Sequence, residues 1–415
     1  MELEPKYFLL DLFKTAVDAA NPQYNFEAHL PECRNDNVIV IGAGKAAASM
    51  ALSFEKHWHG EIKGVAVVPY GHGEKCEKIK IIEASHPTPD QNSQDASEQI
   101  LALTQGLTEN DKIFVLLSGG GSSLLSLPAG DIEFSEKQVI NKALLRSGAT
   151  INEINCVRKH LSAIKGGKLA RACYPATVYT FAISDVMGDD PSVIASGPTV
   201  GDPTTSTDAL NILDKYKISN NVTQWLKDPA SQTIKPDDPL VKNAHFKIIF
   251  NATDMLDFIE KRAKIDELDH INLGEQNGEA RELAKEHAKL ILERPFTKPT
   301  LVFSGGETTV TVKGNGRGGR NCEYLLSLAI ALGENQNIYA IAADTDGIDG
   351  MEDNAGAMIA PDSLTRAEAL NLSLPDMLDN NDSYNAFKKL GDLITTGPTR
   401  TNVNDFRAIL VLPGN

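Results

Sequence analysis

The 415-residue sequence has no apolar run approaching the ~20 residues of a membrane-spanning helix, which argues against an integral α-helical membrane protein. Its first residues, MELEPKYFLLDLFK, are acidic where a secretory signal is basic, so we expect no signal peptide. Basic charge is scarce as well: 40 Lys and Arg against 56 Asp and Glu give a net charge of −16. A nucleic-acid-binding protein normally has a basic surface, so we expect no nucleic-acid partner.

Cysteines are few, odd in number and without C-x-x-C spacing, which is typical of reduced thiols in a cytoplasmic protein: Cys33, Cys76, Cys156, Cys173 and Cys322. Apolar residues, by contrast, make up 41% of the chain, enough for two or three domains with sizeable cores. A strongly acidic protein repels small anions at long range. An anionic substrate would therefore need a local cationic pocket and a divalent metal ion.

Hydrophobic periodicity predicts an α/β protein. Residues 5–20 have apolar positions at helical spacing, and short β-branched runs predict buried strands at 38–41, 64–68, 112–117, 176–183, 246–250, 300–303, 338–343 and 407–412. Helical patterns lie between them at 45–57, 91–105, 135–147, 253–265, 278–293 and 321–332. Strands that alternate with helices imply βαβ units and mostly parallel sheets. The polar, Pro-rich stretch 228–240 suggests a boundary between domains 1–240 and 241–415, although a long surface loop has the same composition.

Gly-rich turns follow several predicted strands, where α/β proteins bind their ligands. In VIVIGAGKAAASMA (38–51), the spacing G-x-G-x-x-A permits a dinucleotide site, yet the next strand ends in Val68-Pro69 without the carboxylate that holds a ribose. Lys45 in the same turn indicates an anion at the helix start, with a solvated lysine as the alternative. The three glycines of LLSGGGSSLL (116–125) offer backbone amides to phosphate or carboxylate oxygens, unless they form a plain flexible turn.

Charged side chains gather in four further segments. RKHLSAIKGGKLAR (158–171) is a basic island that suits either an anion-binding face or a solvated helix face. Asp185, Asp189, Asp190 and Asp202 lie in loops after a strand and suit a hard cation or a general base. Arg317 and Arg320 lie among four glycines, as in a phosphoryl clamp, with Glu307 and Glu323 as their expected partners. Asp344, Asp346 and Asp349 follow another buried strand and suggest Mg²⁺ or an anchor for a facing loop.

Together these segments resemble the glycerate kinases that form 2-phosphoglycerate and carry a MOFRL domain. The phrases that carry the resemblance are GAGKAA, HPTPD, LLSGGGSSL, NCVRKHLSAIKGGKLA, ISDVMGDDPSVIASGPT, SGGETTVTV, GRGGRN, ADTDGIDG and TGPTRTNVND. They run in order from about residue 38 to residue 405. One departure is Cys322, where the family pattern usually has Gln, and a thiol cannot replace the hydrogen bonds of an amide.

The resemblance implies a Rossmann-like N-terminal domain, a second α/β domain with the MOFRL region at about 298–412, and an active-site cleft between them. It also implies ATP, Mg²⁺ and D-glycerate, and it puts the phosphoryl-transfer residues at Lys45 and Arg320. Residues 1–240 would then form the kinase domain, and a homodimer is an open expectation.

The resulting hypothesis is in-line transfer of the ATP γ-phosphoryl group to the C2 hydroxyl, with Asp189 orienting or deprotonating that hydroxyl. Asp344 and Asp346 are the metal-ligand candidates. The substrate- and phosphate-binding candidates are Gly44, Ser118, Gly119, Gly120, Gly121, Ser122, Arg158, Gly305, Gly306, Glu307, Arg317 and Gly319. Replacement of Lys45 or Arg320 by Ala is expected to lower kcat by orders of magnitude with the fold intact. The alternatives are an NAD(P)H-dependent hydroxypyruvate reductase and a non-catalytic anion-binding module.

Overall fold

The computed structural model describes residues 4–32, 34–218, 221–334 and 337–413, so the predicted thiol of Cys33 lies outside the described residues. The chain forms two compact units, one of Pro22–Ile249 and one of Met1–Asn21 with Phe250–Asn415. These units differ from the predicted domains 1–240 and 241–415 in two ways. The division lies after Ile249 rather than at residue 240, and the first helix belongs with the C-terminal part of the chain. No helix in the described ranges is long and apolar enough to cross a membrane.

The unit 22–249 is built on a six-stranded sheet of strand order β3-β2-β1-β4-β5-β6. The pairings of β1 with β2 and β4, of β2 with β3, and of β4 with β5 are all parallel. This is the strand order of a Rossmann fold, in which ligands bind beyond the carboxyl ends of β1 and β4. The strands are β1 (Val38–Ala43), β2 (Ile62–Pro69), β3 (Ile79–Ala84), β4 (Lys112–Leu117), β5 (Thr177–Ile183) and β6 (Ala244–Phe250).

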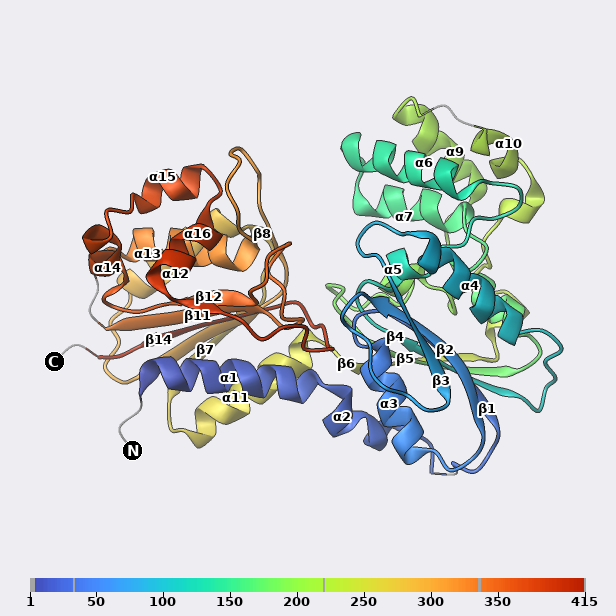
Figure 1. Ribbon diagram of the computed structural model, residues 1–415, viewed down its shortest axis with the longest axis horizontal. Helices are drawn as coiled ribbons and strands as arrows, with labels where there is room; N and C mark the ends of the chain where they lie inside the picture. Colours follow the sequence, from blue (N-terminus) through green and yellow to red (C-terminus); the bar gives the residue numbers. More distant parts are fainter. Residues whose placement is uncertain (1–3, 33, 219–220, 335–336, 414–415) are drawn as a thin grey trace. The chain divides into compact units, whose positions relative to one another are not determined.

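Alternating side chains of these strands pack on the two faces of the sheet. Phe114 of β4 contacts Phe54 of α3 and Trp58, the residue after α3, on one face. On the other face, Ile113 and Val115 join a core cluster that includes residues of α4. In Figure 1, α6, α7, α9 and α10 form a further helical layer beyond α4 and α5. The helices of this unit are α2 (Pro22–Asn25), α3 (Ala47–His57), α4 (Gln91–Leu103), α5 (Gly121–Leu124), α6 (Phe134–Arg146), α7 (Ile151–His160), α8 (Lys168–Cys173), α9 (Ser206–Lys215) and α10 (Val222–Leu226).

The second unit contains a mixed sheet of strand order β13-β12-β11-β14-β9-β7, and here the expectation of a mostly parallel sheet is wrong. β14 pairs antiparallel with both β11 and β9, and only β7 pairs parallel, with β9. Two parallel strands need a long crossover connection between them. β14, the last strand of the chain, instead lies between β11 and β9 and runs in the opposite direction to both. The strands are β7 (Asp269–Glu275), β9 (Thr300–Gly305), β11 (Ile338–Asp344), β12 (Gly356–Ile359), β13 (Leu393–Ile394) and β14 (Asp405–Val411), with a separate pair β8 (Gly278–Glu279) and β10 (Thr308–Thr309).

Helices cover both faces of this sheet (Figure 1). Residues of α12 and α13 share one core cluster with β9, β11, β12 and β14. On the other face, α11 packs on β7 and β9, and α1 packs on β11 and β14. The helices are α1 (Pro5–Ala20), α11 (Ala252–Ile265), α12 (Ala280–Leu292), α13 (Arg320–Leu332), α14 (Ser363–Ala369), α15 (Leu374–Asp379) and α16 (Ser383–Leu390).

The Pro-rich stretch 228–240 is not a domain boundary. Ser231, Thr233 and Ile234 are buried, and the amide of Ile234 donates to the carbonyl of Gly166 at 3.0 Å. The stretch is therefore a structured loop inside the unit 22–249, which is the alternative that its composition allowed.

Candidate functional site

Lys45 lies in a tight turn between β1 and α3, one residue before the position that caps the helix. The backbone amides of this turn are already used. Those of Gly44 and Lys45 donate to the carbonyls of Val67 and Gly119 at 3.1 and 2.8 Å, and that of Ala46 donates to Ser118 Oγ at 2.9 Å. Gly44 is required here, since a Cβ at this φ of 127° would lie 2.3 Å from Ser118 Oγ. The three amides of this turn therefore already have acceptors within the protein.

The segment Ser118–Ser122 follows β4 and lies against this turn. Within the part of the chain that the structure describes, the amides of Gly119 and Gly120 donate to no protein group. A Cβ built on Gly120 would lie 3.0 Å from His86 Cδ2 and 3.6 Å from Lys45 Cγ, so the glycine leaves space between the histidine and the lysine. Ser122 Oγ bonds to Ser196 Oγ at 2.6 Å, and the amide of Gly121 donates to Ser118 O. The predicted loop therefore has two amides without an acceptor in the described part of the protein, that of the buried Gly119 and that of the half-buried Gly120, and Gly120 lies next to Lys45.

The loop that begins at His86 continues along a cavity of about 520 Å³. Arg158 of α7 lines this cavity together with Lys142 of α6, and no carboxylate does: the lining residues are Pro87, Thr88, Pro89, Ser135, Gln138, Val139, Asn141, Lys142, Leu145 and Arg158. Arg158 Nε donates to Asn141 Oδ1 at 2.6 Å, and burial lowers the pKa of the guanidinium. No carboxylate in the described ranges pairs with Arg158, so its remaining N–H groups suit an anion.

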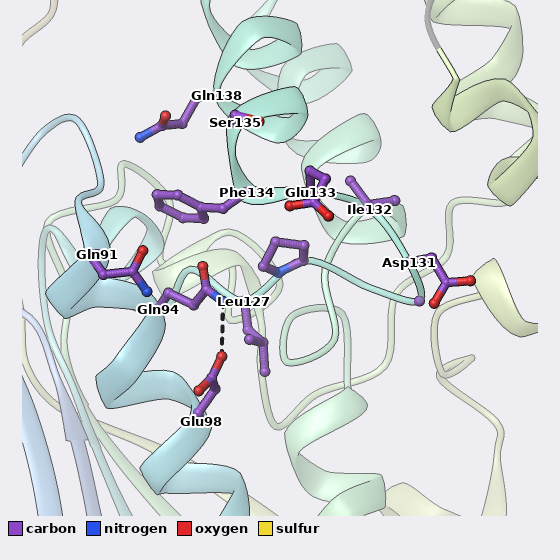
Figure 2. Close-up of a pocket in the computed structure, with 12 residues that line it drawn as sticks. Gln91, Gln94, Glu98, Leu127, Asp131, Ile132, Glu133, Phe134, Ser135 and Gln138 are labelled. Atoms are coloured by element: carbon purple, nitrogen blue, oxygen red, sulfur yellow. Dashed lines mark hydrogen bonds between the residues drawn. The ribbon is translucent and has the colours of Figure 1, made fainter.

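A larger cavity, of about 690 Å³, lies between α4 and α6 (Figure 2). Its lining includes Glu98, Asp131 and Glu133 but no lysine or arginine. Gln94 donates to Glu98 at 2.9 Å within it. A wall with three carboxylates repels an anionic substrate, so the smaller cavity at Arg158 is the better candidate despite its size.

The basic run 158–171 does not form the anion-binding face considered above, because three of its lysines are buried in the protein. Lys159 pairs with the buried carboxylate of Asp202 at 3.2 Å. Lys165 and Lys168 are each 2% exposed and donate to backbone carbonyls. Burial, together with the charge of Arg171, lowers the pKa of Lys168 to about 7. These lysines therefore stabilise the surrounding loops through buried contacts. Of the run 158–171, only Arg158 lines the cavity of about 520 Å³.

The aspartates after β5 separate into different roles. Asp202 is 1% exposed and belongs to the ion pair with Lys159, while Asp190 accepts from the amide of Ser192 at 2.8 Å. Asp189, the predicted base, is half-buried and has a φ of 56°, in the left-handed region that non-glycine residues rarely adopt. Its role stays a prediction.

In the second unit, the guanidinium of Arg320 at the start of α13 is surrounded by three carboxylates. Nε contacts Asp405 at 2.8 Å, Nη2 contacts Asp344 at 2.6 Å, and Nη1 contacts Glu307 at 3.2 Å. Burial alone would lower the pKa of Arg320, but these carboxylates outweigh it and raise that pKa. Asp344 and Asp405 are buried, whereas the Glu307 side chain is 56% exposed. Two contacts therefore fix the guanidinium and the third is open to exchange.

The other predicted residues of this unit have mostly structural contacts. Arg317 pairs with Glu352 and lies over the Tyr384 ring. Glu323 pairs with Arg281 rather than with either predicted arginine. Gly305 and Gly306 accept through their carbonyls from Arg407 Nη1 and the amide of Asp405.

The carboxylate of Asp349 lies so close to position 319 that only glycine fits there. The two oxygens of this carboxylate accept from the amides of Asn321 and Cys322 at 3.0 and 2.9 Å, so Asp349 caps α13. A Cβ on Gly319 would lie 2.2 Å from Asp349 Oδ1. At the position of the unusual Cys322, the buried Sγ accepts from Asn354 Nδ2 at 3.2 Å.

Magnesium was predicted at Asp344 and Asp346, and the donor set does not fit a preformed metal site there. Asp344 is paired with Arg320 and also accepts from the amide of Asp346, and Asp346 accepts from the amide of Ile348. Among the described residues, no three His, Cys, Asp or Glu side chains are arranged to hold a metal ion.

Sequence reasoning missed Asp405 as the residue that fixes Arg320. The only signal was its place at the end of the quoted phrase TGPTRTNVND, just before an apolar run. Nothing local shows that this strand enters the sheet antiparallel.

Comparison with known proteins adds to this geometry. Residues 8–228 match a domain of unknown function, DUF4147, and residues 300–405 match the MOFRL family. A D-glycerate 2-kinase of Thermotoga maritima is 41% identical over 96% of this chain and 97% of its own. The chain belongs to the MOFRL-domain glycerate 2-kinase family.

A solved structure and a second curated relative are similar to this chain over nearly its whole length. The crystal structure of a Thermotoga maritima glycerate kinase aligns with a TM-score of 0.89 at 39% identity, over 98% of this chain and 99% of that one. A relative from Agrobacterium vitis is 45% identical over 99% of this chain and 95% of its own length, and its name assigns it provisionally as a hydroxypyruvate reductase. The fold of two α/β units and the family resemblance are thus confirmed.

Proposed function

We propose that this chain is a glycerate 2-kinase, which transfers the γ-phosphoryl group of ATP to the C2 hydroxyl of D-glycerate and forms 2-phosphoglycerate. The observation that carries the proposal is the position of Lys45 next to Gly120, whose amide, like that of Gly119, has no acceptor among the described residues, at the carboxyl ends of β1 and β4. This is the edge of a Rossmann sheet where ligands bind, and it offers a cation and two N–H donors to phosphate oxygens.

In the proposed reaction, the C2 oxygen forms a bond to the γ-phosphorus, while the bond from that phosphorus to the β–γ bridging oxygen breaks and ADP leaves. The hydroxyl proton passes to Asp189. Lys45 and the amides of Gly119 and Gly120 stabilise the charge on the transferring group, since phosphoryl transfer depends mainly on positioning and electrostatics. Arg158 holds the substrate carboxylate in its cavity.

Arg320 is proposed to add positive charge to the transferring group. An arginine has five N–H donors. Here Nε and Nη2 donate to Asp405 and Asp344, and Nη1 forms an ion pair with Glu307. The exposed Glu307 is the partner that a phosphoryl oxygen would displace. That Lys45 and Arg320 act on the same phosphoryl group stays a prediction.

ATP is the proposed phosphoryl donor, and Mg²⁺ is proposed to arrive with the nucleotide as the MgATP complex. Mg²⁺ is commonly bound through substrate phosphates and only one or two protein carboxylates, and this agrees with the lack of a preformed three-ligand set in the described ranges. A cytoplasmic location and assembly as a homodimer stay predictions from the sequence.

A nicotinamide-dependent reductase is less compatible with this geometry. In a dinucleotide-binding fold the amides of the first βα turn approach the pyrophosphate, yet here they donate to Val67, Gly119 and Ser118. The end of β2 carries no carboxylate for the ribose. Glu83 on the neighbouring strand instead accepts from the amides of Gly71 and Gly73, both at 3.1 Å.

The test is to incubate the full-length protein with ATP, Mg²⁺ and D-glycerate and to identify the product by ³¹P NMR. We expect 2-phosphoglycerate, with no product when ATP is omitted. Formation of 3-phosphoglycerate would refute the regiochemistry. Absence of any phosphorylated product, with oxidation of NADH by hydroxypyruvate, would establish the reductase. Binding of ATP without turnover would leave only an anion-binding module.

A further inference from the structure

We propose that Lys165 is a positioning residue, which holds the segment Ser118–Ser122 in the conformation that binds the nucleotide phosphates. This inference rests on the proposed function, because Lys165 contacts the backbone of a segment that forms the same site. Lys165 belongs to the basic run 158–171, for which an anion-binding face was one of two expectations, yet it lines neither of the two cavities described above.

The contacts of the Lys165 ammonium group all lead to one turn. Nζ donates to the carbonyl of Ser122 at 2.5 Å and also to the carbonyl of Leu125. Ser122 is the second residue of α5, the single helical turn that begins directly after Gly120, and Leu125 is the residue that caps its C-terminal end. A helix of one turn leaves its carbonyls without intrahelical partners, so these acceptors need a donor from elsewhere in the protein. Lys165 supplies it.

The backbone around Lys165 connects the same turn to a second loop. The amides of Gly166 and Gly167 donate to the carbonyls of Ser196 and Gly197 at 3.1 and 2.8 Å. Ser196, in turn, bonds through Oγ to Ser122 Oγ at 2.6 Å. Lys165 therefore lies at the point where three segments meet, and Ser122 is held both through its carbonyl and through its hydroxyl.

The chemistry of the residue indicates that these contacts are the reason for its presence. Lys165 is 2% exposed, and no carboxylate in the described ranges forms an ion pair with it. Burial, reinforced by Lys137 and Arg158, lowers its pKa well below the ordinary value. Transfer of an ammonium group from water into such a place is unfavourable, and a methionine would fill the same volume without that cost. Only a side chain with N–H donors can satisfy both carbonyls.

If α5 shifts, the amides of Gly119 and Gly120, which directly precede it, shift as well. A displacement of about 1 Å in a positioning element is enough to change a rate about 100-fold. Loss of the hydrogen bonds from Lys165 to the carbonyls of Ser122 and Leu125 should therefore weaken binding of the nucleotide phosphates. It should affect D-glycerate less, because Arg158 lines its cavity from α7 and does not depend on this turn.

The experiment compares K165M with K168M in the full-length enzyme. Lys168 is the matched control: it is equally buried, but its ammonium donates to the carbonyls of Ser162 and Lys159 and not to α5. For K165M we expect the KM for ATP to rise about tenfold or more, with the KM for D-glycerate changed less than about threefold. The thermal shift induced by ATP, which needs no turnover, should fall in parallel. For K168M we expect a lower melting temperature with the KM for ATP within about threefold of wild type.

Equal KM values for ATP in K165M and wild type would overturn the proposal, and so would an equal rise of that KM in K168M. Should K165M fail to fold, K165Q serves in its place, because its side chain is shorter than that of lysine and has two N–H donors rather than three, so it cannot reproduce both contacts of Lys165. We expect an intermediate KM for ATP in K165Q, and a fully normal value in that folded variant would also overturn the assignment. The wild-type assay separates the two hypotheses. If wild-type protein makes no phosphoglycerate the proposed function fails, whereas an active wild type with an unaffected K165M removes only the role of Lys165.

Discussion

Arg320, for which a role in phosphoryl transfer is proposed, also has structural contacts with buried carboxylates. Asp344 and Asp405 are directly opposite each other in the pairing of β11 with β14, and both are buried. Arg407 pairs with Asp405 from its other side. Without the guanidinium of Arg320, two buried carboxylates on adjacent strands would lack a shared counter-charge. The sequence-based expectation that R320A leaves the fold intact is therefore revised.

We predict that R320A lowers both activity and stability, whereas R320K lowers activity with a smaller loss of stability. Removal of one partner from a buried ion-pair network typically costs about 3–5 kcal/mol, and R320K retains the charge. Lysine cannot form the forked contacts, and a transition-state arginine is worth about 10³–10⁵ in kcat. Urea unfolding and kcat measure the two effects. R317A is the control, because Arg317 is exposed and should affect stability little. Turnover near wild type in R320K would contradict a role for Arg320 in phosphoryl transfer.

Buried lysines predict an unusual pH dependence of stability. Burial, with the charges of Arg158 and Lys168, lowers the pKa of Lys137 to about 7, and the pKa of Lys168 is also about 7. Between pH 7 and the ordinary lysine pKa of 10.5, the unfolded chain therefore binds more protons than the folded chain. The free energy of unfolding should then rise with pH, by up to about 1.4 kcal/mol per pH unit for each lysine.

The useful window is pH 7 to 9, because burial raises the pKa of the thiols of Cys156 and Cys173 to about 11 and 12 and this opposes the trend at higher pH. Urea denaturation at several pH values measures the slope, and K137M should show a smaller slope than wild type. A wild-type stability that is flat or falls between pH 7 and 9 would show that these lysines are protonated in the folded protein.

At the scale of helices and strands, the sequence predicted most elements of the sheets but not every pairing direction. All eight predicted strands are present, and most of them are short apolar runs that are buried on both faces, although β6 has exposed residues. The edge strand β3 was missed because only its first and last residues are buried and the residues between them are partly exposed. The direction of β14 was missed because it depends on which strands flank it, and both β9 and β11 lie far away in the sequence.

The same limit applies to the candidate site. Lys45 and the Gly-rich segment after β4 could be predicted, because each follows its strand directly and the Rossmann order brings the two strands together. The roles of the lysines in 158–171 could not be predicted. A run of basic residues has the same sequence pattern whether its side chains are exposed to solvent or buried against backbone carbonyls. Asp349 likewise caps a helix that begins 29 residues earlier in the chain.

For the whole molecule, sequence families and compact units divide the chain differently. The match to DUF4147 begins at residue 8, inside α1, yet α1 folds with residues 250–415. Its apolar face is fully buried at Leu9 and Leu12. Phe13 stacks on Phe406 of β14 at 6.0 Å between ring centroids, and Asp11 pairs with Arg262 of α11 at 2.8 Å. The first helix is therefore part of the core of the C-terminal unit.

This assignment predicts that L12A destabilises the unit containing residues 250–415 and leaves the unit 22–249 unchanged. Replacement of a fully buried leucine by alanine costs about 2–5 kcal/mol. Both tryptophans, Trp58 and Trp225, lie in the unit 22–249, so tryptophan fluorescence reports that unit alone, whereas far-UV circular dichroism reports both. In L12A, part of the circular dichroism signal should be lost at lower temperature while the fluorescence transition stays in place. L144A, at an equally buried position of α6, should instead shift the fluorescence transition. An equal shift of fluorescence in L12A would mean that the two units unfold as one, because the loss of contacts made by α1 would then have reached the tryptophans.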